Sequence, residues 1–327
     1  MSSLDSRVLL CIDAPPIIVG EKTNANGSRL FRDLLAKDDY ESMVHMAKEQ
    51  LAEGAHILDV CTAYVSRNEV KDMTTYVNML NTQVNIPLMI DSTEVPVIEK
   101  SLELISGKSI INSINLEDGE ERMNKICPMA KEFGAALVAL TIDEDGMAKT
   151  ATKKLEIAKR IHELATGRFG IASKDLIFDT LTFTLGSGDE EFRKAGIETI
   201  EGIKLIKKEF PEVKTILGIS NISFGLSPNS RQVLNSVFLH ESIVNGLDLA
   251  IVNAKKIVPL YKIPKEQKDT ALDLIYDRRK DGYDPLTKFM SLFENIRKTD
   301  VGAIHELHLQ TPLRSIEEKL KNRIVDG

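Results

Sequence analysis

Eight short apolar runs, each ending on an acid or an amide, constrain the fold of this chain more than any other feature. The runs and the polar residues at their ends are 17–20 with Glu21 and Asn24, 57–58 with Asp59, 88–90 with Asp91, 110–111 with Asn112, 136–142 with Asp143, 176–178 with Asp179, 216–220 with Asn221 and 249–252 with Asn253. Segments with helical periodicity separate the runs. Eight parallel strands that alternate with helices close into a barrel, whose functional side chains stand at the carboxyl ends of the strands. The sequence therefore predicts an α/β fold, a (β/α)8 TIM barrel, with carboxylates and carboxamides gathered at one rim.

The segments between and after the runs predict helices and a division of the chain. In residues 152–165, apolar side chains recur at intervals of three or four positions, which is typical of an amphipathic helix. Beyond residue 260 no further strand is indicated, and helices are predicted at 265–279, 285–297 and 314–325. A barrel of this class takes about 250 residues. We therefore expect the barrel in residues 1–260 and a C-terminal helical extension or linker in residues 261–327.

Composition excludes several classes of partner. The chain has 327 residues and a net charge of −7, with 43% apolar and 28% charged residues. Nucleic acid is not an expected partner, because binding its phosphates requires a basic face. No apolar run approaches the ~20 residues that cross a bilayer, and residues 1–18 lack the basic and apolar regions of a signal peptide. We therefore expect a cytoplasmic protein with no membrane association.

The cysteines, histidines and glycines do not predict a metal, disulfide or nucleotide site. Cys11, Cys61 and Cys127 are odd in number and widely spaced, and the six histidines show no HExxH spacing. A zinc site or a disulfide framework would require closer pairs such as CxxC. Glycine-rich phosphate loops and the GxSxG elbow of serine hydrolases are also missing from the sequence. We expect no bound metal.

The mixture of acids and amides at the predicted rim favours one class of ligand. Carboxylates accept charge-assisted hydrogen bonds from N–H groups, whereas carboxamides donate and accept together. Such a set suits a polar heterocycle that carries N–H donors and ring acceptors along one edge. A single aspartate after a strand more often caps a helix or a turn. Several such residues at one rim, in contrast, indicate a binding site.

Several strings along the chain resemble, in order, one known set of motifs. They are Gly20-Glu21-Lys22-Thr23-Asn24 with Asn26-Gly27-Ser28, Met89-Ile90-Asp91-Ser92, Ile111-Asn112-Ser113, Phe178-Asp179, Gly218-Ile219-Ser220-Asn221-Ile222-Ser223-Phe224-Gly225, Ile251-Val252-Asn253-Ala254 and Asp277-Arg278-Arg279-Lys280-Asp281-Gly282. In this combination they resemble the pterin-binding, dihydropteroate synthase-like barrels of cobalamin-dependent methionine synthases and of methyltetrahydrofolate:corrinoid methyltransferases. The resemblance covers roughly residues 16–290. Lys22 departs from it, because the family usually has arginine at this position.

The resemblance implies a role for each polar residue of the rim. Asp91, Asn112 and Asp179 would bind the pterin ring, with Asp143 close by, and Glu21, Asn24 and Asp59 would line the first two strand ends. Asn221 would form a hydrogen bond to the N5 nitrogen. Arg231 would support the Asn221 loop or a substrate charge, and Asn253 would order a loop or bind the substrate. A departing amine nitrogen must gain a proton or a strong hydrogen bond. An amide is a poor proton donor, so we expect the proton to come through water.

The implied reaction transfers the N5 methyl group of 5-methyltetrahydrofolate to cob(I)alamin and leaves tetrahydrofolate. The corrinoid would be carried by a partner protein or domain, and the resemblance leaves a homodimer open. Methylation of homocysteine is not expected of this chain, because the clustered cysteines of a zinc site are missing.

Two other functions stay open. A dihydropteroate synthase would condense a pterin pyrophosphate with an aminobenzoate, and it typically has a basic motif with a histidine near the last strand. Here that strand ends in Asn253-Ala254-Lys255-Lys256, without a histidine. A non-catalytic pterin-binding module would keep the polar rim and lack turnover.

Overall fold

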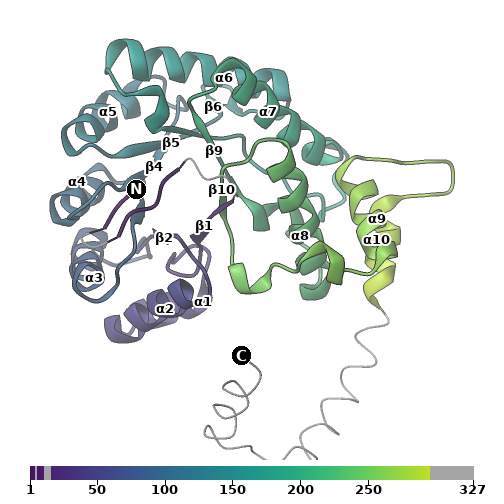
Figure 1. Cartoon of the computed structure of the whole chain (residues 1–327), viewed down its shortest axis with the longest axis horizontal. Coiled ribbons are helices and arrows are strands. Elements are labelled where there is room, and N and C mark those ends of the chain that lie inside the picture. Colours follow the sequence, from purple (N-terminus) through teal and green to yellow (C-terminus); the bar gives the residue numbers. More distant parts are fainter. Residues whose placement is uncertain (4–5, 11–15, 295–327) are drawn as a thin grey trace, which may run out of the picture.

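A closed parallel barrel forms the centre of the computed structural model, which describes residues 1–3, 6–10 and 16–294 (Figure 1). Its eight strands are β1 (Ile17–Gly20), β2 (Ile57–Val60), β3 (Leu88–Asp91), β4 (Ile110–Ile114), β5 (Ala136–Leu140), β8 (Leu176–Asp179), β9 (Lys214–Gly218) and β10 (Leu249–Ile251). Around the barrel they follow the order β1-β10-β9-β8-β5-β4-β3-β2, and all neighbours are parallel. The predicted (β/α)8 barrel is confirmed.

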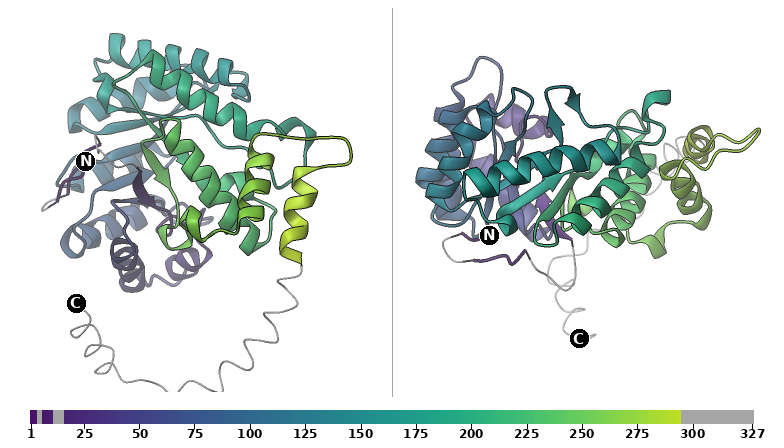
Figure 2. Two further views of the ribbon diagram at one scale, coloured as in Figure 1. Left: turned by 45° about the vertical axis from the view of Figure 1, so that its right-hand side comes forward. Right: turned by 90° about the horizontal axis from the view of Figure 1, so that it is seen from above.

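Helices cover the outside of the barrel (Figure 2). They are α1 (Arg29–Leu35), α2 (Tyr40–Ala52), α3 (Glu69–Gln83), α4 (Val95–Leu104), α5 (Glu121–Phe133), α6 (Ala151–Glu163), α7 (Ala195–Glu209) and α8 (Pro228–Val244). Side chains of Asp39, Asn68, Thr150 and Ser227 accept hydrogen bonds from the first turns of α2, α3, α6 and α8, which satisfies otherwise unpaired N–H groups. Helix α1 is not among the predicted elements, because seven residues are too few to establish a helical period.

Alternate residues of the strands fill the interior of the barrel. This layer consists of Ile17, Val19, Ile57, Met89, Ile110, Ala136, Val138, Ile177, Ile216 and Leu249. The opposite face of each strand packs against the helices, because successive side chains of a strand point to opposite sides. Strands covered on both faces are nearly all apolar. Most polar side chains of the barrel therefore lie near the strand ends and in the loops that follow.

The fifth predicted run forms two separate pieces. Strand β5 ends at Leu140, and β6 (Ile142–Asp143) then pairs antiparallel with β7 (Gly146–Met147) in a small hairpin. Gly146 has a φ of +99°, a conformation that residues with a side chain rarely adopt. The Asp145-Gly146 turn therefore lets the chain reverse, so the prediction of one strand through residue 142 was wrong.

The seventh predicted run also ends early. Strand β9 stops at Gly218, and residues Ile219–Ser223 form a 3-10 turn. Asn221 therefore lies on a tight turn beyond the strand. Local hydrogen bonds hold this turn, including one from the backbone N–H of Phe224 to the carbonyl of Asn221 at 3.3 Å.

Two C-terminal helices, α9 (Lys265–Ile275) and α10 (Pro285–Glu294), pack against each other and against α8 at one side of the barrel (Figure 2). The predicted helix at 265–279 ends at Ile275, and Asp277 has a φ of 47° that is incompatible with a continuing helix. The predicted helix at 314–325 lies outside the described residues, and the division at residue 260 stays a prediction. Among the described residues, no helix is both long and apolar enough to cross a bilayer.

Candidate active site

The strand ends bring the predicted polar residues to one rim of the barrel. Asp91 of β3 and Asn112 of β4 are paired in the parallel register. Asp179, the last residue of β8, is paired with Leu140 of β5. Because all the barrel strands run in one direction, their last residues and the loops that follow lie at the same end. Three of the predicted pterin-binding residues therefore share this end.

The side chain of Asn24 donates hydrogen bonds to two carboxylates of the rim. Its Nδ2 donates to Oδ2 of Asp59 and to Oδ2 of Asp91, each at 2.7 Å. Its Oδ1 accepts from the backbone N–H of Asn26 at 2.8 Å, and its backbone bridges to Cys61 just beyond β2. Asn24 is thereby fixed between the ends of the first three strands.

Burial alters the proton affinity of these carboxylates. Asp59 is 3% exposed, and its Oδ1 has no hydrogen-bond partner among the described residues. Burial and, to a lesser extent, the charge of Asp91 raise the pKa of Asp59 well above its ordinary value. Burial also raises the pKa of Asp91 to about 6. Buried acceptors that share one donor favour a ligand that brings more N–H groups.

Asp179 provides a further, partly buried carboxyl group at the rim. Burial raises its pKa to about 6, and the Lys154 ammonium opposes that shift. Its Oδ1 accepts from the backbone N–H of Leu181 at 2.7 Å. No other hydrogen bond to this carboxyl group is present within residues 16–294, so its second oxygen is available to a ligand.

A basic side chain supports the turn that carries Asn221. Arg231 of α8 donates from Nε to the Ser223 hydroxyl at 3.2 Å and from Nη2 to the Ser220 carbonyl at 3.4 Å. Its guanidinium also lies 5.2 Å from the centre of the Phe224 ring. These contacts agree with the predicted support of the Asn221 loop. Gly218 makes room for the amide, because a Cβ there would lie 3.3 Å from the Asn221 Nδ2.

Glu21 links the first strand to the same turn. The Ser220 hydroxyl donates to the Oε2 of Glu21 at 3.3 Å. Burial raises the pKa of Glu21. The side-chain Oδ1 of Asn253 is buried without a partner among the described residues. Lys22, by contrast, forms an ion pair with Glu53 at 2.5 Å and takes no part in these contacts.

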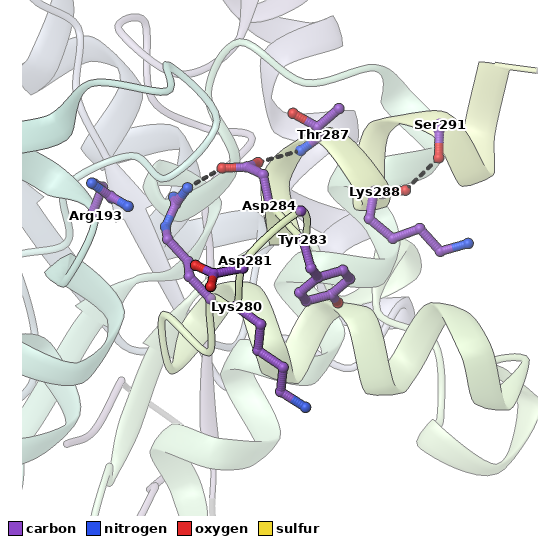
Figure 3. Close-up of a pocket in the computed structure, with 10 residues that line it drawn as sticks. Arg193, Lys280, Asp281, Tyr283, Asp284, Thr287, Lys288 and Ser291 are labelled. Carbon is purple, nitrogen blue, oxygen red and sulfur yellow. Dashed lines mark hydrogen bonds and ion pairs between the residues drawn. The ribbon is translucent and has the colours of Figure 1, made fainter.

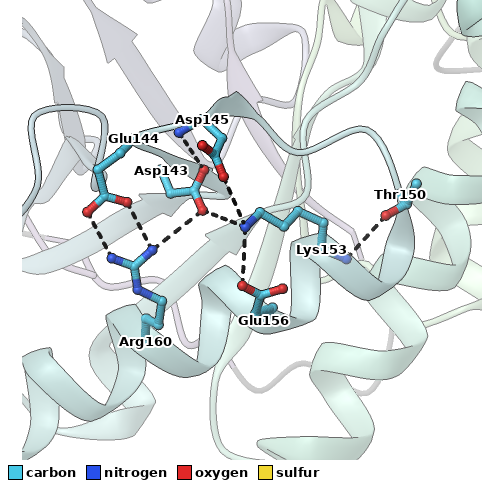
Figure 4. A network of polar contacts seen from close by, with 7 residues as sticks. All are labelled: Asp143, Glu144, Asp145, Thr150, Lys153, Glu156 and Arg160. Carbon is cyan, nitrogen blue, oxygen red and sulfur yellow. Dashed lines mark hydrogen bonds and ion pairs between the residues drawn. The ribbon is translucent and has the colours of Figure 1, made fainter.

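Asp143 lies in a separate cluster of ion pairs (Figure 4). Its Oδ2 contacts the Lys153 ammonium at 2.8 Å and the Arg160 guanidinium at 3.4 Å, while its Oδ1 accepts from the backbone N–H of Asp145 at 3.1 Å. Both oxygens are thus occupied, and the residue is 2% exposed. Asp143 stabilises the β6–β7 hairpin, and its proximity to a pterin stays a prediction.

One supporting residue of the rim, Arg122, is not predicted from the sequence. Arg122 of α5 donates to the carbonyls of Ser113 at 2.6 Å, Thr93 at 2.8 Å and Ser92 at 3.0 Å. These carbonyls follow Asp91 and Asn112 directly or closely, so Arg122 holds the ends of β3 and β4 together. Nothing in the sequence distinguishes this arginine from a solvated charge at the start of a helix.

A cavity of about 730 Å³ lies elsewhere, at the connection between α9 and α10 (Figure 3). None of its lining residues ends a barrel strand. Arg279 in this cavity is already paired with Asp277 and Asp284. The cavity is therefore separate from the rim that carries the predicted site residues. Within residues 1–3, 6–10 and 16–294, no cluster of histidine, cysteine and acidic residues could hold a metal ion.

Comparison with known families agrees with the chemistry of the rim. The model of a family described as pterin binding enzymes matches residues 20–253, which include all the barrel strands after the first three residues of β1. The chain belongs to the pterin-binding enzyme family. The match ends at Asn253, one of the predicted rim residues, and the predicted pterin-binding fold is confirmed.

Two curated relatives of this pterin-binding chain are methionine synthases. The protein of Mycobacterium tuberculosis (strain ATCC 25618 / H37Rv) is 48% identical over 330 residues, which cover 100% of this chain and 28% of that protein. The protein of Mycobacterium leprae (strain TN) is 48% identical over 331 residues, which cover 100% of this chain and 27% of that protein. The chain therefore spans little more than a quarter of the length of these relatives.

Solved structures with a similar fold are dihydropteroate synthases. One from Yersinia pestis, bound to a pterine-sulfa conjugate, has a TM-score of 0.53 and 16% identity and covers 81% of this chain and 93% of its own. A dihydropteroate synthetase with a product has a TM-score of 0.54 and 14% identity and covers 82% of this chain and 95% of its own. At these identities the likeness concerns the fold alone.

Proposed function

We propose that this barrel binds 5-methyltetrahydrofolate and transfers its N5 methyl group to cob(I)alamin carried by a partner protein or domain. The observation that carries the proposal is the set of rim groups Asp91, Asn112 and Asp179 on a barrel of the pterin-binding family. The 48% identity to methionine synthases supports methyl transfer as its use.

The buried carboxyl groups suit the donor edge of a pterin. The amino and amide N–H groups of such a ring would donate to Asp91 and Asp179, and Asn112 would donate and accept beside them. Removal from water weakens competition for these bonds and makes an unpaired group costly. A ligand that satisfies both carboxylates therefore binds in one orientation, with the other edge of its ring system turned toward Asn221.

Asn221 would act where charge develops. As the methyl group leaves N5, the nitrogen gains electron density and requires a proton or a hydrogen bond. A preorganised amide dipole stabilises such a change without costly rearrangement. Arg231 would hold the turn in position through Ser220 and Ser223. The corrinoid supplies the nucleophile, and the proton would arrive through water because an amide is a poor acid.

Exposed apolar side chains at the rim support the approach of a partner. Tyr64 and Val65 follow β2, Met147 belongs to the hairpin after β5, and Phe224 follows β9, and all four are exposed. Soluble proteins expose such side chains in one region chiefly at interaction sites. A corrinoid protein or domain that covers this rim would bring its nucleophile to the open end of the barrel.

The alternatives have weaker support. Dihydropteroate synthases share the fold at 14% and 16% identity, and Asn253-Ala254-Lys255-Lys256 lacks the histidine expected near their last strand. Failure to bind a pterin pyrophosphate would exclude this activity. A non-catalytic pterin-binding module would bind methyltetrahydrofolate without transferring its methyl group to any corrinoid.

The decisive experiment is spectroscopic. The protein is mixed anaerobically with 5-methyltetrahydrofolate and photoreduced free cob(I)alamin, and the cobalamin spectrum is followed with time. We expect conversion to methylcobalamin with the native protein and no conversion with the heat-denatured protein, which serves as the control. Absence of conversion both here and with a corrinoid-binding domain, in a sample where folate binding is measured, would contradict the proposal and favour the binding module.

A further inference from the structure

The lysine Lys154 on α6 is buried without exposure to solvent. Its ammonium donates to the carbonyl of Ala148 at 3.0 Å, to that of Thr180 and, at 3.5 Å, to that of Leu181. Among the described residues it forms no ion pair with a carboxylate. Burial lowers its pKa to about 8, so it is still largely protonated at neutral pH. Its ammonium also lies 5.5 Å from the centre of the Phe183 ring. A buried cation without a carboxylate partner is costly, which calls for a function.

The surrounding helix is adapted to this side chain. Gly202 lies inside α7, where glycine weakens a helix by about 1 kcal/mol relative to alanine. A Cβ at this position would lie 2.8 Å from the Cδ of Lys154, which is closer than real contacts allow. The lysine stem therefore passes over a glycine that the helix would otherwise disfavour.

The ammonium holds a strained turn beside Asp179. Leu181 has a φ of 58°, in the left-handed region that branched side chains rarely occupy. Its carbonyl also accepts from the Thr199 hydroxyl of α7 at 2.9 Å. In this conformation its backbone N–H donates to Oδ1 of Asp179 at 2.7 Å. The turn thus fixes one carboxylate oxygen and leaves the other for a ligand.

The same relationship occurs at two other strand ends. Arg122 of α5 holds the carbonyls that follow Asp91 and Asn112, and Arg231 of α8 holds the turn of Asn221. In each case a cation from an outer helix binds the backbone beside a candidate site residue. Lys154 is the helix cation that binds the backbone at the end of β8.

We propose that Lys154 is a positioning residue for the pterin, which acts by fixing the turn at residues 180–181 and thereby the carboxylate of Asp179. The inference rests on the proposed function, because it requires that Asp179 binds the pterin. It predicts an electrostatic effect as well as a steric one. The charged groups that influence Lys154 are Asp179 at the end of β8 and Glu198 on α7. The ammonium in turn lowers the pKa of Asp179.

The test compares Lys154→Met with Lys159→Met. Methionine keeps an unbranched stem over Gly202 and removes the charge, and Lys159 is a half-exposed lysine on the same helix.

Binding of 5-methyltetrahydrofolate is titrated between pH 5 and pH 8, and thermal unfolding is recorded in parallel. We expect about tenfold weaker binding at pH 7 for Lys154→Met, as for the loss of one charge-assisted contact. The pH below which binding is lost should also rise, because Asp179 without the cation protonates more readily. Lys159→Met should match the wild type.

The pH below which folate binding is lost, here called the acid limit, distinguishes a positioning role of Lys154 from a purely structural one. A purely structural lysine would alter thermal unfolding and leave the acid limit unchanged. A folded Lys154→Met protein with wild-type affinity and acid limit overturns the inference. If Lys154→Met does not fold, Lys154→Gln carries the test, because glutamine retains N–H donors for the turn and lacks the charge. An acid limit shifted to higher pH then supports the inference, and an unshifted one overturns it. A wild-type protein that does not bind methyltetrahydrofolate would instead refute the proposed function.

Discussion

Asp59 and Asp91 share one hydrogen-bond donor group, the side-chain amide nitrogen of Asn24, which lies 2.7 Å from an oxygen of each. The two carboxylates come from neighbouring strands, and the donor comes from the loop after β1. These hydrogen bonds connect the loop after β1 to the ends of β2 and β3. They also mean that a change at Asn24 affects both acids together.

Asn24→Ala should destabilise the protein by about 1–3 kcal/mol at pH 7, because two buried acceptors lose their donor. Both carboxyl pKa values should rise further, since the Asn24 hydrogen bonds lower them. The loss should therefore be smaller at pH 5, where protonation relieves the charges. Chemical denaturation at the two pH values measures this, with the exposed Asn78→Ala as control. Equal losses at both pH values would contradict the shared-donor explanation.

Asp179→Asn should raise the stability of the fold and weaken the binding of methyltetrahydrofolate. The pKa of Asp179 is raised from 3.8 to about 6, so in the wild type the folded state binds the proton more tightly than the unfolded state between these values. The ionised form consequently lowers stability above pH 6, and this penalty disappears as the pH falls below 3.8. We expect Asp179→Asn to gain on the order of 1–3 kcal/mol at pH 8 and no advantage near pH 3.5.

The measurement for Asp179→Asn is the free energy of unfolding across this pH range, together with methyltetrahydrofolate affinity. Affinity should fall at least about tenfold, because an amide replaces a charged acceptor. The exposed Asp118→Asn is the matched control and should change neither quantity. A variant that is no more stable than the wild type at pH 8 would show that the ionised carboxylate carries no penalty in the fold.

Asn221→Ala should lose far more turnover than folate affinity. A donor that acts on charge developing in the transition state is typically worth about 10²–10³ in rate. Single-turnover transfer to free cob(I)alamin gives the rate, and equilibrium titration gives the affinity. Asn229→Ala, an exposed position at the start of α8, serves as the control. Equal losses in rate and affinity would make Asn221 a binding residue only.

The barrel and its rim could be predicted because both depend on local patterns. Apolar runs of strand length, separated by helical periods, predict parallel strands, and residues such as Asp91 and Asp179 directly follow those runs. The end of β5 at Leu140 could not be predicted, since Thr141 and Ile142 are as compatible with a strand as the residues before them. There the reversal at Gly146, a tertiary choice between hairpin and extension, decides the outcome.

The supporting cations could not be predicted for a different reason. Lys154 follows Lys153 in a helix, and only the packing of α6 against α7 makes one buried and the other partly exposed. Arg122 likewise binds carbonyls 9 to 30 positions earlier in the chain. Such contacts depend on how strand ends and helices meet in space. Sequence patterns report the face of an element, and not the atoms that its side chains reach.

A last prediction concerns the partner surface at the rim. Val65 is 84% exposed on the loop after β2, and Val244 is 68% exposed at the C-terminal end of α8, which leads back to the opposite end of the barrel. Val65→Asp should leave methyltetrahydrofolate binding and methyl transfer to free cob(I)alamin unchanged, because the side chain is largely exposed and is not one of the candidate site residues. It should slow transfer to a corrinoid held by a protein domain about tenfold, since a charge buried at an apolar interface is costly. Val244→Asp, with the same change in chemistry, should affect neither reaction. Steady-state rates with free and protein-bound corrinoid provide the comparison, and equal slowing by both variants would argue against docking at this rim.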